Sequence, residues 1–128
     1  MILDSSAVVA ILCREPGHSE LLRKLSAASL VAIPAPIVFE AAMVLTIKLR
    51  RDGLALLNDF LAEAGIEVVP FGREQASAAL AAYLRYGKGR HPAGLNFGDC
   101  LSYAAASISG EPLLSVGGDF AQTDLTAA

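Results

Sequence analysis

The chain has 128 residues, a formal net charge of −3 and 54% hydrophobic residues. This length holds one domain with a single hydrophobic core and leaves no room for a separate substrate domain. The acidic balance argues against a broadly basic surface that grips nucleic acid through many phosphate contacts, although it is compatible with a nuclease whose acids bind metal.

Membrane insertion and export are not predicted. The uncharged stretch 25–39 contains Pro34 and Pro36 and ends at Glu40, so it is too short and too interrupted to span a bilayer. Asp4 interrupts the first apolar segment after three residues, which leaves no signal peptide. We therefore expect a cytoplasmic protein.

Short apolar strands alternate with longer helical patterns along the chain. Strands are predicted at 1–3, 30–33, 66–69 and 112–116, and helices at 6–14, 18–28, 36–50, 54–64, 73–86 and 97–109. Segment 87–94, rich in glycine, is the one long loop, and Asn96 is a good N-cap for the helix that follows. Strands that alternate with helices predict an α/β fold with a parallel sheet.

Four acids occupy positions that such a fold would bring together. Asp4 follows the first strand, Glu40 lies in the first turn or so of a helix, Asp99 is a third helical residue and Asp119 follows the last strand. The carboxyl edge of an open parallel sheet is where ligands bind. Converging carboxylates repel one another, and Mg²⁺ or Mn²⁺ relieves that repulsion while preferring oxygen ligands. The pattern predicts a divalent-metal site.

Each acid also has a structural interpretation. Asp4 and Asp99 could cap the helices they precede or begin, and Asp119 could form an Asx-turn. Taken alone, each of these three is more often a cap than a ligand. Glu40 lies in a strongly apolar stretch where an unpaired carboxylate is costly, so it calls for a cation or water.

The cysteines and histidines have simpler interpretations. Cys13 and Cys100 lie in apolar helical patterns without Cys-x-x-Cys spacing, which predicts reduced buried thiols. His18 and His91 have no companion at a metal-ligand interval. The basic residues gather near two predicted helix ends, where they either complement the helix dipole or contact phosphate; they are Lys48, Arg50 and Arg51, and Arg85, Lys88 and Arg90.

The segments that carry the acids form a recognisable set. They are Met1-Ile2-Leu3-Asp4-Ser5-Ser6, Pro36-x-x-x-Glu40, the run from His91 through Asn96-Phe97-Gly98-Asp99-Cys100, and Asp119 to Asp124. Together they resemble PIN-domain ribonuclease toxins of the VapC type, and the resemblance covers the whole chain in order. It implies one PIN domain over 1–128, with a three-layer α/β/α fold and a mostly parallel central sheet.

The resemblance also implies an activity and partners. A VapC-type toxin is an Mg²⁺-dependent endoribonuclease, with Mn²⁺ as a substitute, and is neutralised by a cognate VapB-type antitoxin. The high mean hydropathy of +0.50 indicates that part of the surface is covered, which favours a homodimer or a toxin–antitoxin hetero-oligomer.

The implied site can be assigned residue by residue. The first three catalytic and metal-binding acids map to Asp4, Glu40 and Asp99, whereas the fourth is Asp119 or Asp124, because Gly118 stands where related sequences often carry an acid. The Ser115 hydroxyl could assist the metal or its water. Arg85, Lys88 and Arg90, in or beside loop 87–94, are the expected substrate contacts. One metal ion and two both remain open.

Three other classes compete with this interpretation. A receiver-like phosphoacceptor needs an Asp after a central strand and a Lys after a late one, and the strands ending near Ile33 and Val69 are followed by no such Asp. A haloacid-dehalogenase-type phosphatase needs a second Asp two residues after the first, where this chain has Ser6. A degenerate PIN domain that only binds RNA or protein is the non-enzymatic alternative.

Overall fold

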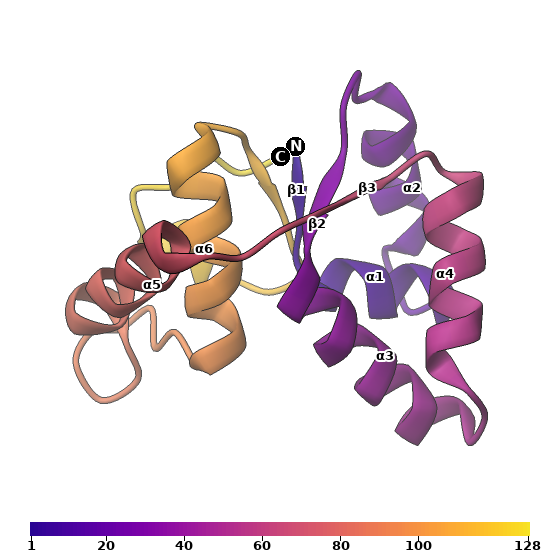
Figure 1. Cartoon of the computed structure of the whole chain (residues 1–128), viewed down its shortest axis with the longest axis horizontal. Coiled ribbons are helices and arrows are strands. Elements are labelled where there is room, and N and C mark those ends of the chain that lie inside the picture. The colour runs from indigo at the N-terminus through magenta and orange to yellow at the C-terminus, as the bar shows by residue number, and fades with distance from the viewer.

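The computed structural model describes all residues from 1 to 128 (Figure 1). Strand β1 (Ile2–Leu3) leads into helices α1 (Ser5–Leu12) and α2 (His18–Ala27), strand β2 (Ala32–Pro34), helices α3 (Ala35–Leu49) and α4 (Gly53–Glu63) and strand β3 (Glu67–Val69). The chain continues with α5 (Arg73–Tyr86), α6 (Phe97–Ser109), β4 (Leu113–Leu114) and the short 3-10 helix η1 (Phe120–Gln122). All predicted helices and strands are present.

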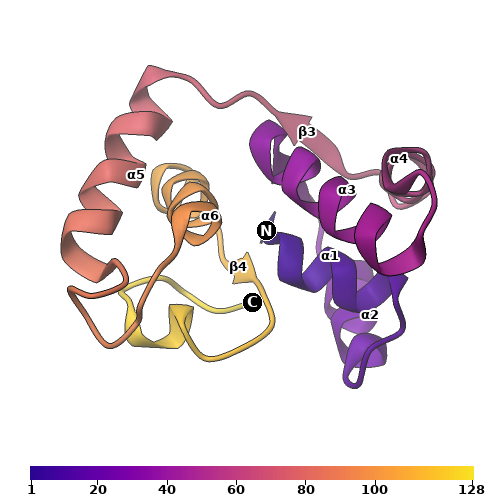
Figure 2. The ribbon, with the colours of Figure 1, turned by 90° about the horizontal axis from the view of Figure 1, so that it is seen from below.

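The four strands form one parallel sheet in the order β3-β2-β1-β4. Successive side chains of a strand point to opposite faces of its sheet. Ile2, Ala32 and Leu113 therefore pack on α5 and α6, whereas their successors along the strands pack on α1 to α4. Figures 1 and 2 show these two helical layers on either side of the sheet. The predicted three-layer α/β/α fold is confirmed.

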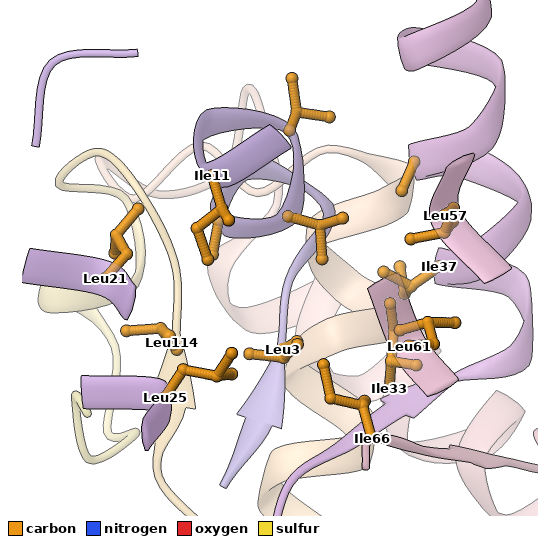
Figure 3. Close-up of a cluster of buried hydrophobic side chains, with 14 of the residues drawn as sticks. Leu3, Ile11, Leu21, Leu25, Ile33, Ile37, Leu57, Leu61, Ile66 and Leu114 are labelled. Carbon is orange, nitrogen blue, oxygen red and sulfur yellow. The ribbon is translucent and has the colours of Figure 1, made fainter. Parts of the chain in front are cut away.

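The larger hydrophobic cluster lies between the sheet and the first four helices (Figure 3). Leu3 and Ile33 come from the sheet, Ile37 from α3 and Leu57 from α4, and all four side chains are fully enclosed. The segments that carry Asp4 and Glu40 are thus anchored by fully buried neighbours. None of the helices combines the length with the apolar character that a membrane-spanning segment requires.

Strands β2 and β4 differ from their predicted bounds for identifiable reasons, and every other helix and strand ends within two residues of its prediction. Strand β2 is displaced toward Pro34, which pairs with Val69 of β3 before α3 begins. Proline is tolerated in this place because it ends the strand and leads directly into a helix. Strand β4 is shorter than predicted, since the chain leaves the sheet before the turn at Gly117, whose φ is +98°.

The strand order determines where a ligand site can form. From β1 the chain proceeds to β2 and β3 on one side, and it later returns to place β4 on the other side. The backbone N–H of Asp4 donates to the Leu114 carbonyl oxygen at 3.0 Å, so the ends of β1 and β4 lie together. The carboxyl edge at such a reversal of strand order is the usual ligand site of an open α/β sheet.

Candidate active site

Asp4 is a buried carboxylate with every oxygen engaged. Its side chain is only 3% exposed. Oδ2 accepts from the backbone N–H of Ser6 at 3.0 Å and from the Ser6 hydroxyl at 2.5 Å, and Oδ1 accepts from the Ser102 hydroxyl at 2.6 Å. Asp4 is therefore the N-cap of α1, as one prediction had it, and it also lies at the edge of the sheet.

Glu40 reaches this edge from the second turn of α3 and is half-buried. The Ser5 hydroxyl donates to its Oε1. The residue after Asp4 thus gives this carboxylate a protein donor, in addition to the cation or water that the sequence predicts. The carboxyl group also lies against the backbone of Gly98: a Cβ on that glycine would be 2.7 Å from Cδ of Glu40 and 2.8 Å from Oε1. Glu40 thus contacts the first turn of α6.

Asp99 is the third residue of α6 and completes a reciprocal cap. Its Oδ2 accepts from the backbone N–H of Asn96 at 2.9 Å, and Asn96 Oδ1 accepts from the backbone N–H of Asp99 at 2.9 Å. The capping role predicted for Asp99 is confirmed. The charged form of the Asp99 carboxyl group is nevertheless strongly disfavoured by its surroundings.

The pKa of Asp99 is raised to about 6, mainly by burial and also by the negative charges of Asp4, Asp119 and Glu40, against the opposing hydrogen bond from Asn96. The repulsion expected for converging carboxylates is therefore present in this structure. It links all four candidate acids, since the other three act on the same carboxyl group.

The structure separates the two candidates for the fourth acid. Asp119 is exposed, directly precedes η1 and makes no side-chain cap there. Asp124 is engaged elsewhere: the Tyr103 hydroxyl donates to it at 2.7 Å and Arg85 pairs with it at 3.3 Å. The Tyr103 hydrogen bond is the main reason that the pKa of Asp124 is lowered. Asp124 ties the C-terminal segment to α5 and α6, whereas the charge of Asp119 acts on Asp99.

Three serine hydroxyls hold these acids, and none of them was singled out from the sequence. Ser5 donates to Glu40, while Ser6 and Ser102 donate to Asp4. The Asp-Ser-Ser sequence placed two of them beside the first acid. Ser102 is fully buried, three residues after Asp99 and thus on the same face of α6, a spacing that could have identified it.

The predicted substrate contacts lie at several different places. Ser115 lines a cavity of about 160 Å³ beside the C-terminal segment, together with Gly117 and Phe120. The Arg85 guanidinium is held by Asp124 and lies 4.7 Å from the centre of the Tyr86 ring. Ser115 and Arg85 are therefore surrounded by other parts of the protein and do not lie beside each other.

Lys88 lines an open groove of about 820 Å³ between α5 and α6. Phe97, which is 82% exposed, and Tyr83 are also part of its wall. Arg90 places its guanidinium 5.1 Å from the centre of the Tyr83 ring. No acidic residue lines this groove, which adjoins the acids through Asn96.

The donor chemistry fits a hard divalent cation, although no three His, Cys, Asp or Glu side chains are arranged to enclose one. Magnesium keeps several water ligands and is commonly held through one or two carboxylates, so a closed protein cage is not required. The cysteines are unpaired, with Cys100 buried and Cys13 half-buried. His91 Nδ1 accepts from the backbone N–H of Ala93 at 3.0 Å, which is a structural contact.

A parallel sheet between two helical layers, with carboxylates gathered at the ends of β1 and β4 and at the start of α6, defines an α/β protein of the PIN class. The sequence model of the PIN domain matches residues 1–125, and the chain belongs to this family.

Its curated relatives are of the VapC type. The chain is 45% identical over 126 residues to Ribonuclease VapC36 of Mycobacterium tuberculosis, covering 98% of this chain and 91% of that protein. It is 44% identical over 127 residues to Ribonuclease VapC of Mycolicibacterium smegmatis, covering 99% and 98% of the two chains. The predicted family and the predicted class of enzyme, a ribonuclease, are confirmed by these relatives.

Solved structures share the fold at low sequence identity. The crystal structure of Mycobacterium tuberculosis VapC20, a sarcin–ricin loop cleaving toxin, is similar with a TM-score of 0.80 and 15% identity, covering 99% of this chain and 97% of that one. A toxin–antitoxin complex from Klebsiella pneumoniae is similar with a TM-score of 0.72 and 18% identity, covering 99% and 95%.

Proposed function

We propose that residues 1–128 form a single PIN domain that acts in the cytoplasm as the Mg²⁺-dependent endoribonuclease toxin of a type II toxin–antitoxin system. The observation that carries this proposal is the electrostatic coupling of Asp99 to Asp4, Glu40 and Asp119. A cation stabilises such a group of acids, whereas a purely structural site would gain nothing by keeping four of them together.

Asp4, Glu40, Asp99 and Asp119 are the residues that would hold Mg²⁺ or Mn²⁺. When bound, such an ion lowers the pKa of a bound water and offsets the charge of a phosphodiester during hydrolysis. The protein's own side chains contribute by orienting the carboxylates. The hydroxyls of Ser6 and Ser102 set the Asp4 carboxylate from two sides, and the Ser5 hydroxyl sets that of Glu40.

The first turn of α6 supports the same site. Unpaired backbone N–H groups give a helix N-terminus a partial positive charge that favours nearby anions. Asp99 lies in this turn and Glu40 lies against it at Gly98. The helix therefore stabilises two of the four negative charges without neutralising them.

The groove between α5 and α6 is the proposed path of the RNA. Its aromatic residues Phe97 and Tyr83 offer surfaces for unstacked bases, and Lys88 and Arg90 offer charge for phosphates. Single-stranded segments or loops fit these features best, since stacking requires bases that are not paired within a duplex.

A VapB-type antitoxin is the proposed protein partner. Along α3, Phe39 is 71% exposed, Met43 47% and Ile47 71%, and a spacing of four residues places them on one face of the helix. Such an apolar face suits an amphipathic segment of a partner protein. An antitoxin that also carries a basic side chain could occupy the acidic site, and a homodimer could use the remaining apolar surface.

A non-catalytic PIN domain remains the alternative because of one observation. Asp119 is exposed, and its side chain makes no cap, so its geometry is less constrained than that of the other acids. A domain with three well-placed acids and a loose fourth could bind RNA without cutting it.

The deciding experiment is incubation of the purified protein with total cellular RNA and Mg²⁺ or Mn²⁺, beside Asp99→Asn and an EDTA control. Discrete fragments that disappear in both controls are expected. Binding of RNA and metal without fragments would support the non-catalytic alternative. Adding excess antitoxin should protect the RNA, and cleavage that persists in the complex would count against the proposed inhibition.

A further inference from the structure

We propose that Ser6 is a positioning residue for this reaction, because its hydroxyl joins the Asp4 carboxylate to the backbone that leads to Asp119. The inference rests on the proposed function, since positioning has a meaning only if the acids hold a metal ion. It assigns to one side chain the alignment of the first and the fourth acid.

The Ser6 hydroxyl makes two hydrogen bonds in opposite senses. It donates to Oδ2 of Asp4 at 2.5 Å and accepts from the backbone N–H of Val116 at 2.9 Å. Val116 lies just beyond β4 and three residues before Asp119. One hydroxyl thus links a segment at the start of the chain to one near its end.

This bond is not needed to cap the helix. The backbone N–H of Ser6 already satisfies the N-cap at Asp4, as it would for any residue at this position. The hydroxyl is therefore an additional donor whose partner is a candidate metal ligand. Groups that hydrogen-bond to metal ligands orient them, and their removal costs about 10- to 100-fold in metal affinity or activity.

The segment from Val116 to Asp119 is exposed, and the next buried side chain along the chain is Phe120. The segment continues through Gly117, with φ at +98°, and Gly118 before it reaches the exposed Asp119. A Cβ added at either glycine would meet no neighbouring atom within 4 Å, so the two glycines face open space on that side. Loss of the Ser6 hydroxyl would consequently remove a contact that holds this turn and leave Oδ2 of Asp4 with the Ser6 backbone N–H alone.

Because of Ser102, a substitution of Ser6 should change the placement of Asp4 relative to Asp119 without leaving the buried Asp4 carboxylate unpaired. Ser102 is fully buried and donates to Oδ1 of Asp4 at 2.6 Å, so the carboxylate keeps a hydroxyl partner when Ser6 is changed. Val116 is exposed, and water can replace its lost acceptor. The fold should survive the substitution while the relative placement of the two acids does not.

The experiment compares Ser6→Ala, Ser6→Thr and Ser6→Cys with the wild type and with Ser109→Ala. Ser109 is a matched control, because its hydroxyl bonds only near the far end of α6, to the carbonyl oxygens of Ala105 and Ala106 and the backbone N–H of Glu111. The measurements are Mn²⁺ affinity by calorimetry without RNA, kcat and KM for RNA cleavage, and Tm.

We expect Ser6→Ala to weaken Mn²⁺ binding and to lower kcat by about 10- to 100-fold, with KM for RNA nearly unchanged. Ser6→Thr, which restores a hydroxyl, should recover most of the loss. Ser109→Ala should match the wild type. If Ser6→Ala fails to fold, Ser6→Cys keeps a side-chain donor, although a weaker one on a larger atom, and should show a smaller loss of the same kind.

The positioning role would be overturned if Ser6→Ala kept Mn²⁺ affinity and kcat within twofold of the wild type. If Ser6→Ala does not fold, the same result for Ser6→Cys would overturn it. Either result would leave the proposed nuclease intact. A wild type that binds Mn²⁺ without cutting RNA would instead refute the proposed function, and the affinity comparison would still decide the role of Ser6. A wild type that binds no Mn²⁺ would overturn both.

Discussion

The contact between Gly98 and Glu40 makes Gly98→Ala a substitution that should damage the site and spare the fold. A Cβ at Gly98 would be 2.7 Å from Cδ of Glu40 and 2.8 Å from Oε1. These atoms belong to the end of a flexible side chain, so the carboxylate can move away while the backbone stays. In moving, it must leave the Ser5 hydroxyl that donates to it.

The stability effects of this substitution nearly cancel. Replacing glycine with alanine in a helix gains up to about 1 kcal/mol. Losing a hydrogen bond to a partly exposed carboxylate costs about 1 to 2 kcal/mol. The net change should stay within about 1 kcal/mol, or a few degrees in Tm. Displacing a ligand or positioning group by about 1 Å can reduce the rate about 100-fold, so cleavage should fall by that order.

Gly53→Ala is the matched control, because the added Cβ would clash with main-chain atoms. A Cβ there would meet the carbonyl oxygen of Ala42 and lie 2.7 Å from the backbone N of Thr46. Neither can move without shifting α3 against α4, which should cost about 1 to 3 kcal/mol.

Thermal unfolding by circular dichroism and RNA cleavage under identical conditions separate the two effects. Wild-type cleavage by folded Gly98→Ala would show that the position of Glu40 does not matter and would refute the reasoning. So would a Gly98→Ala protein that is less stable than Gly53→Ala.

Three further outcomes follow from the same contacts. Asp99 has a folded-state pKa of about 6, above its ordinary 3.8, so its contribution to stability is complete at low pH and declines as the pH rises through about 6. Asp99→Asn should therefore stabilise the metal-free protein at pH 7 by about 1 kcal/mol, after discounting for solvent screening, with the difference gone below about pH 4; equal Tm values at pH 7 would contradict this. Asp119→Asn should abolish most RNA cleavage, whereas Asp124→Asn should keep it, because this carboxylate is engaged with Tyr103 and Arg85; the reverse order in a cleavage assay would exchange their roles. Leu57→Ala, at a fully enclosed position of α4, should destabilise the fold by about 2 to 5 kcal/mol in denaturant unfolding, and a smaller loss would mean that the core collapses around the gap.

The sequence was most informative where local chemistry determines local structure. The prediction for α5 matches its observed bounds of Arg73–Tyr86, and Asn96 caps α6 as its residue type indicated. Apolar runs indicated all four strands, and β1, β2 and β4 are buried, whereas β3 at the edge of the sheet is largely exposed. Hydrogen bonding between strands set their ends, and no local signal states that Pro34 pairs with Val69.

The composition of the site was less predictable because it depends on contacts across the chain. Asp119 and Asp124 were equivalent from spacing alone, and only the path of the C-terminal segment past Tyr103 and Arg85 distinguishes them. Ser102 acts on Asp4, a residue 98 positions away in the sequence. No periodicity within α6 identifies the strand end that this helix will face.

The capping and the metal-binding interpretations of these acids are not alternatives. Asp4 caps α1 with the same Oδ2 that accepts the Ser6 hydroxyl, and Asp99 caps α6 while bearing the repulsion of its neighbours. Using one carboxylate for both purposes makes its geometry as rigid as the helix terminus, which is the preorganisation that a catalytic metal site needs. It also determines which substitutions are informative. Asparagine retains a capping oxygen and removes the charge, whereas alanine removes both and costs about 1 kcal/mol of helix stability besides. Cleavage lost in Asp4→Asn or Asp99→Asn at unchanged fold would therefore report on the loss of the carboxylate group and not on the loss of the helix cap.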